Sequence, residues 1–131
     1  MKSKCKSSDI IIAIVDDDES VREALAGVLK AAGFAVRTYA SAEEFLEFCD
    51  GQNFACALLD IRLPGMSGVE LQRKMIESGN PAPIVFITAH GDENLRNVLI
   101  GAGARGFLEK PVRREELLAE IGAAISKTAE G

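Results

Sequence analysis

The sequence predicts an α/β fold, a doubly wound parallel sheet of five strands flanked by five helices. Three continuous apolar runs, at residues 10–15, 54–59 and 84–87, have the length of strands that are buried on both faces. Between these runs, apolar residues recur at helical spacing, and the connections are short. Parallel neighbours require right-handed crossovers, which place helices on both faces of one sheet.

Two strand–helix units precede the central strand. After the strand at 10–15, Ser20 and Glu23 have the spacing of a capping box at the start of the first helix. The strand at 34–39 is more polar, which is typical of a position nearer the edge of a sheet. The segment 41–44 (SAEE) has the same box spacing and opens the second helix.

Three more units follow, beginning with the run at 54–60, which is the buried central strand and ends in Asp60. We expect the third helix, from Ser67, to pack through a set that includes Ile76. A fourth helix, from about residue 92 to 102, should bury Val98 among other apolar residues. A short strand at 106–109 and a final helix ending near residue 127 complete the chain.

Length and composition indicate one domain and exclude several functions. With 131 residues, we expect a flexible tail at 1–8, one domain at 9–127 and a short tail at 128–131. The net charge of −5 argues against direct nucleic-acid binding by this domain, and no apolar run is long enough to span a membrane. Three cysteines without a C-x-x-C pair suggest neither a disulfide framework nor a zinc site, and fit a reducing cytoplasm.

Polar residues follow four of the five strands. Asp16 and Asp17 come after the first strand, Asp60 ends the third, Thr88 ends the fourth and Lys110 follows the fifth. In open α/β sheets these carboxyl ends meet at one crevice. Three acids suit Mg²⁺, and a lysine suits an anion such as phosphate, so we expect a phosphoryl-transfer site in which Asp60 is the nucleophile. Each residue alone is more often a cap, a turn residue or an exposed charge.

Four segments near the strand ends stand out: residues 14–18 (IVDDD), 59–68 (LDIRLPGMSG), 87–90 (ITAH) and 108–111 (LEKP). They resemble the signatures of the response-regulator receiver domain, a CheY-like family with a flavodoxin-like fold. The resemblance covers about residues 9 to 127. The segment after Asp60 and the residues from Thr88 to Asp92 look most like receivers of FixJ/NarL-type two-component transcriptional regulators.

The resemblance implies a phosphorelay function with assigned roles. Asp60 would take a phosphoryl group from a sensor histidine kinase. Mg²⁺ would be bound by Asp17, Asp60 and the backbone carbonyl of Arg62, with Asp16 acting mainly through water. Lys110 would pair with the phosphoryl oxygens, and its peptide bond to Pro111 is typically cis.

The resemblance also implies a switch. Thr88 and Phe107 occupy the switch positions, and the face formed by the fourth helix, fifth strand and fifth helix would then change to control dimerisation or an output domain. Ile100 falls off the expected buried stripe and is a candidate for that interface. His90 and Arg62 are candidates for setting phosphoryl lifetime, and each could equally be a surface residue.

Two other interpretations compete with the receiver. Residues 16–20 (DDDES) partly match the first motif of haloacid-dehalogenase-type phosphatases, in which Asp16 would carry the phosphoryl group, but no further acidic pair follows Lys110. A phosphate-independent interaction domain would keep only the fold. The receiver interpretation makes the chain a signalling domain with only self-directed phosphoryl transfer and autodephosphorylation, rather than an enzyme. Two possibilities stay open for its output: a DNA-binding domain beyond Gly131, or a domain that works alone.

Overall fold

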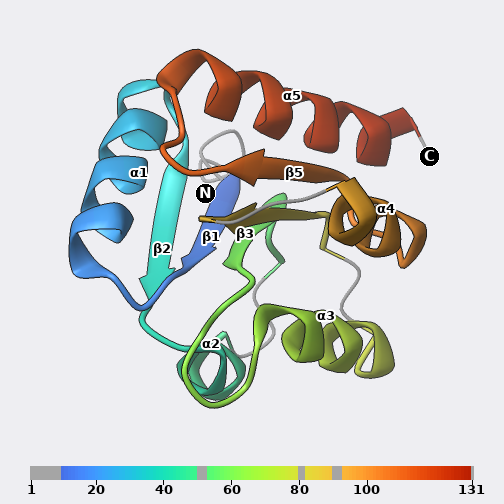
Figure 1. Cartoon of the computed structure of the whole chain (residues 1–131). Coiled ribbons are helices and arrows are strands. Elements are labelled where there is room, and N and C mark those ends of the chain that lie inside the picture. Colours follow the sequence, from blue (N-terminus) through green and yellow to red (C-terminus); the bar gives the residue numbers. More distant parts are fainter. Residues whose placement is uncertain (1–9, 50–52, 80–81, 90–92, 131) are drawn as a thin grey trace, which may run out of the picture.

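Five parallel strands form a single sheet in the order β2-β1-β3-β4-β5 (Figure 1). The structure is a computed structural model that describes residues 10–49, 53–79, 82–89 and 93–130, so the predicted N-terminal tail lies outside the described residues. The strands are β1 (Ile11–Val15), β2 (Ala35–Tyr39), β3 (Cys56–Asp60), β4 (Ile84–Thr88) and β5 (Gly106–Glu109). The predicted doubly wound sheet is confirmed, with the polar strand β2 at one edge and the fully buried β3 in the centre.

Helices cover both faces of the sheet (Figure 1). They are α1 (Glu19–Ala31), α2 (Ala42–Phe48), α3 (Gly68–Glu77), α4 (Glu93–Gly101) and α5 (Arg114–Glu130). One core cluster joins the sheet to α1 and α5, and a second joins it to α2, α3 and α4. Among the described helices, none combines the length and apolar character that crossing a bilayer requires.

Alternation along the strands assigns each side chain to one of these two cores. In β3, Cys56 and Leu58 pack towards α1 and α5, whereas Ala57 and Leu59 pack towards α2, α3 and α4. The same alternation directs Asp60, the next residue, towards the α1 and α5 side. The alternation along each strand therefore determines to which face of the sheet its last side chain points.

The first helix begins earlier than the sequence suggests, so the predicted Ser20–Glu23 capping box is wrong. Asp18 is the N-cap, and its carboxylate accepts hydrogen bonds from the backbone N–H groups of Ser20 at 2.9 Å and Val21 at 3.3 Å. An aspartate is as good an N-cap as a serine, and it comes two residues sooner.

The other two helix starts with this sequence pattern behave differently from each other. Ser67 and Glu70 form a complete capping box at the start of α3. Ser41 caps α2, but the carboxylate of Glu44 accepts a hydrogen bond from Ala40 N–H, at 3.2 Å, rather than from the cap residue itself.

Two large apolar residues expected in the core are exposed, as is the smaller Ala102. Ile76 on α3 and Val98 on α4 are 59% and 66% exposed, because each helix turns a different face to the sheet. The buried residues of α3 are Gly68, Leu71, Gln72 and Met75, and α4 buries Leu99. Ile100 is exposed, as predicted. The final helix reaches Glu130, so residues 128–130 continue α5 instead of forming a tail.

Candidate functional site

Three aspartates gather at the carboxyl ends of β1 and β3. Asp16 directly follows β1, Asp60 ends β3, and these strands are hydrogen-bonded neighbours with Val15 opposite Leu59. One carboxylate oxygen from each of Asp16, Asp17 and Asp60 lies within 4.8 Å of the other two. Asp16 and Asp60 are buried and Asp17 is exposed. The cluster therefore combines two buried carboxylates at the ends of neighbouring strands with a third that is exposed to solvent.

Lys110 brings a positive charge to this cluster from the far side of β4. Its Nζ atom lies 3.0 Å from Asp16 Oδ2 and 3.2 Å from Asp60 Oδ2. The backbone N–H of Lys110 donates to the Thr88 carbonyl oxygen at 2.8 Å, which fixes the start of the Lys110 segment against the end of β4. The Lys110–Pro111 peptide bond is cis.

Burial and neighbouring charges shift the pKa values of Asp60 and Lys110. Burial, together with the charge of Asp16, raises the pKa of Asp60 above its ordinary value, although the Arg62 N–H and Lys110 oppose this shift. Partial burial lowers the pKa of Lys110, but the Asp16 and Asp60 carboxylates raise it by more, so the net shift is upward. These shifts favour the charged form of Lys110 and disfavour ionisation of Asp60, an effect on Asp60 that a further cation would oppose.

Backbone and guanidinium groups hold the two buried aspartates in place. The Arg62 N–H donates to Asp60 Oδ1 at 3.1 Å, and the Asp18 N–H donates to Asp16 Oδ1 at 2.9 Å. The Arg22 guanidinium on α1 donates to the Asp16 backbone carbonyl at 2.7 Å. Arg22 carries no signal in the sequence, because its contact with the loop before α1 depends on how the helix leaves the strand.

One buried oxygen of this cluster has the Lys110 ammonium as its partner. Within the described residues, Asp16 Oδ2 is buried and pairs with Lys110 Nζ at 3.0 Å. Three carboxylates and one ammonium leave two negative charges in excess when all are ionised. A hard divalent cation with oxygen ligands fits both this excess charge and the set of carboxylate oxygens. Asp16, Asp17 and Asp60 are thus the residues that could hold Mg²⁺.

Thr88 and Phe107 lie on the opposite side of the sheet from this ion-pair cluster. Phe86 and Phe107 are register partners on β4 and β5, and both pack against the core towards α2, α3 and α4. Thr88 is buried and lies two residues after Phe86, so its side chain belongs to the same face. Strand alternation thus assigns Thr88 and Phe107 to one face of the sheet, while the backbone of Thr88 stays hydrogen-bonded to Lys110 of the charge cluster.

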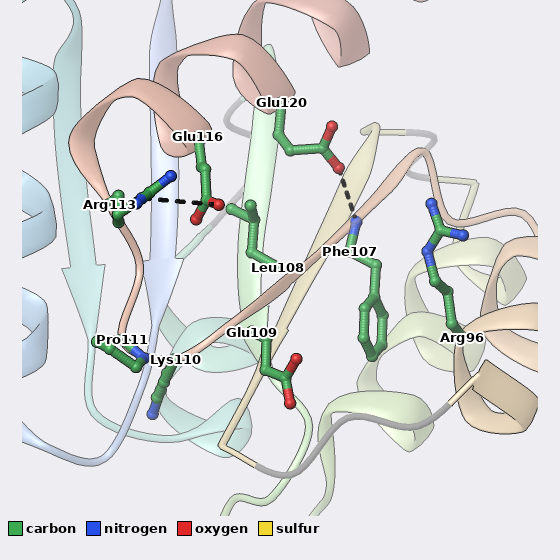
Figure 2. Close-up of a pocket in the computed structure, with 9 residues that line it drawn as sticks. All are labelled: Arg96, Phe107, Leu108, Glu109, Lys110, Pro111, Arg113, Glu116 and Glu120. Carbon is green, nitrogen blue, oxygen red and sulfur yellow. Dashed lines mark hydrogen bonds and ion pairs between the residues drawn. The ribbon is translucent and has the colours of Figure 1, made fainter.

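Phe107 also connects the sheet edge to α5. Its backbone N–H donates to Glu120 Oε2 at 3.0 Å, and Figure 2 shows this carboxylate reaching from α5 to the strand. Phe107, Glu120 and Arg96 line one side of a cavity of about 670 Å³, whose other lining residues include Lys110. The face formed by α4, β5 and α5 is thus contiguous with the charge cluster through Lys110.

The remaining predicted residues lie at the margin of the site. Arg62 has an exposed side chain, and its described link to the cluster is the backbone N–H on Asp60. His90 lies outside the described residues. Gly68, which the sequence analysis did not connect to the site, approaches the backbone of Asp60 so closely that a Cβ would collide with it.

Comparison with known families and proteins gives one consistent result. Residues 12–122 match the model of the response regulator receiver domain. The response regulator protein TodT of Pseudomonas putida is 43% identical over 115 residues, which are 88% of this chain and 51% of TodT. The transcriptional regulatory protein FixJ of Bradyrhizobium diazoefficiens is 40% identical over 114 residues, 87% of this chain and 56% of FixJ.

A solved structure agrees with these relatives. The response regulator StyR superposes with a TM-score of 0.82 at 45% identity, over 92% of this chain and 61% of the StyR chain. The chain spans about half the length of the curated relatives it matches.

Proposed function

The chain belongs to the response regulator receiver domains of two-component systems, and from this membership we propose that Asp60 accepts a phosphoryl group from a phosphohistidine on a sensor kinase. Proteins of this family act in signalling. The observation that carries the proposal is the position of Lys110 Nζ, 3.0 Å from Asp16 and 3.2 Å from Asp60. An ammonium shared between two carboxylates can pair with phosphoryl oxygens once one carboxylate is modified.

The proposed reaction is a displacement at phosphorus. A carboxylate oxygen of Asp60 forms a bond to phosphorus while the P–N bond to the donor imidazole breaks, and that electron pair leaves with the imidazole nitrogen. Mg²⁺ bound by Asp16, Asp17, Asp60 and the Arg62 backbone carbonyl would neutralise charge on the transferring group. Lys110 pairs with the incoming oxygens, and the Arg62 N–H holds the orientation of the Asp60 carboxylate.

Phosphorylation would act beyond the site through Thr88 and Phe107. The modification adds nearly two negative charges next to Lys110. We propose that the Thr88 hydroxyl moves onto the phosphoryl group and that Phe107 turns inward behind it. Because Phe107 also lies on β5 between α4 and α5, this movement would change that face and favour a homodimer or an output domain.

The names of the relatives also suggest the process in which this domain acts. Several relatives are named transcriptional regulators, so we propose that this domain controls transcription where a DNA-binding domain accompanies it, with no direct nucleic-acid contact by these residues. We place the reaction in the cytoplasm, with which the free thiols of Cys49 and Cys56 agree.

Site mapping tests the proposal against the phosphatase alternative. The protein is treated with acetyl phosphate and Mg²⁺, trapped at low pH and analysed by peptide mass spectrometry. We expect the phosphoryl group on Asp60 and its loss in Asp60→Asn, whereas Asp18→Asn, a matched change in the neighbouring loop, should retain it. Phosphate on Asp16 would instead support the dehalogenase-type chemistry, and no Mg²⁺-dependent labelling would favour a phosphate-independent interaction domain.

A further inference from the structure

Glu43 joins two segments that are distant in sequence. It lies in the first turn of α2, and its Oε2 atom accepts a hydrogen bond from the Met66 N–H at 2.9 Å, across 23 residues. Met66 belongs to the β3–α3 loop, residues 61–67, which begins directly after Asp60. The hydrogen bond from Met66 lowers the pKa of Glu43, so the contact is made by an ionised carboxylate at neutral pH.

The β3–α3 loop is fixed at both of its ends. At its start, the Ile61 N–H donates to the Ile87 carbonyl at 3.1 Å, and the Arg62 N–H donates to Asp60 Oδ1. At its end, two carboxylates hold successive N–H groups: Glu43 holds Met66, and Glu70 holds Ser67 at 3.0 Å. Glu70 moves with α3, so of these two carboxylates Glu43 is the one that ties the end of the loop to α2.

We propose that Glu43 is a positioning residue for the phosphoacceptor site, because it fixes the loop that presents the Arg62 carbonyl and the Asp60 carboxylate to Mg²⁺. This inference rests on the proposed function. Glu43 touches neither the metal nor the phosphoryl group. It acts as an outer support of the ligands, and the loss of such supports weakens metal binding without removing a ligand.

The close approach of Gly65 to Glu43 is a second sign that this carboxylate contacts the loop. A Cβ at position 65 would lie 2.6 Å from Glu43 Oε2, so the carboxylate packs directly against the loop backbone. Since that oxygen is the far end of a flexible side chain, Gly65→Ala would displace it and break its contact with Met66. The positive φ of Gly65, 77°, adds a backbone strain that is present with or without Glu43.

Mg²⁺ affinity measured by isothermal titration calorimetry tests the positioning role. We expect Glu43→Ala to weaken Mg²⁺ binding about three- to tenfold, less than the roughly 10–100-fold lost when a direct partner of a ligand is removed, because the Glu43 contact is exposed and supports the loop. Glu43→Gln should restore most of the affinity because it keeps an acceptor oxygen. Glu44→Ala is the matched control: it removes a carboxylate–backbone contact from the same helix turn, to Ala40, without touching the loop. Equal affinity in wild type and Glu43→Ala would overturn the inference, as would equal weakening in Glu44→Ala.

A double-mutant cycle distinguishes loss of the Glu43–Met66 contact from unrelated effects of each substitution. Gly65→Ala and Glu43→Ala break the same contact, so the double variant should lose less Mg²⁺ affinity than the product of the two single losses. Losses that multiply would show that the carboxylate and the loop act independently, and would overturn the inference while leaving the proposed function intact. A wild-type protein that binds no Mg²⁺ would overturn both.

Discussion

One added methyl group at Gly68 should displace the end of β3, which carries Asp60. Gly68 is the first residue of α3, and its N–H donates to the Ile61 carbonyl at 3.1 Å. A Cβ there would lie 3.1 Å from both the Asp60 carbonyl carbon and Ile61 Cα, and closer still to the Asp60 carbonyl oxygen. Carbon atoms pack best at about 3.5–4.0 Å, so the backbone of either β3 or α3 must move by about half an ångström or more.

The size of the effect follows from this overlap. Overpacking of this kind costs about 1–3 kcal/mol, and the greater helix propensity of alanine returns about 0.5–1 kcal/mol. We therefore expect Gly68→Ala to lower the free energy of unfolding by about 1–2 kcal/mol, measured by urea denaturation, and Tm by about 4–8 °C. Because the displaced backbone carries Asp60, labelling by acetyl phosphate should slow about tenfold.

Gly27 supplies the matched control for Gly68. It lies within α1, and a Cβ there would meet no atom within 4 Å. Gly27→Ala should therefore raise the free energy of unfolding by about 0.5–1 kcal/mol and leave labelling of Asp60 unchanged. If Gly68→Ala were as stable as Gly27→Ala and were labelled at the wild-type rate, the close approach of α3 to β3 would not constrain the site, and the reasoning would be refuted.

Three further predictions concern charge, capping and association. Burial and the charge of Asp16 raise the pKa of folded Asp60 above 3.8, so its ionisation opposes folding; Asp60→Asn should raise the free energy of unfolding at pH 7 without Mg²⁺. That gain should vanish as the pH falls through the raised pKa to below 3.8, because the carboxyl group is then neutral in the folded and the unfolded state. The same gain at every pH, measured by urea denaturation, would contradict this prediction. Asp18→Ala should lower the free energy of unfolding, measured by urea denaturation, by about 1 kcal/mol, and Ser20→Ala should lower it by less than about 0.5 kcal/mol. The opposite order would contradict the assignment of Asp18 as the N-cap. Ile100→Glu should leave labelling of Asp60 intact but weaken dimerisation with beryllofluoride about tenfold in analytical ultracentrifugation, since a charge on an apolar contact is costly; unchanged association would remove Ile100 from the interface.

Local patterns predicted most of this fold because they report burial directly. The run at 54–59 is apolar throughout, and β3 is the central strand with every residue buried. Helix phase was predicted less well: Ile76 and Val98 fit an apolar stripe in the sequence, but both are exposed. An apolar residue at the border of a stripe can lie on either side of it, and only the orientation of the helix on the sheet decides which.

Sequence alone determined that Asp16, Asp60 and Lys110 share one edge, because parallel strands end at the same side of a sheet whatever their side chains. Tertiary structure alone decided that Lys110 reaches both carboxylates, that Arg22 holds the Asp16 carbonyl and that Glu43 holds Met66. These contacts join elements whose relative placement is set by packing in two separate cores. No local pattern encodes a distance between α2 and a loop 23 residues away, so the supports of the site become visible only once the chain is folded.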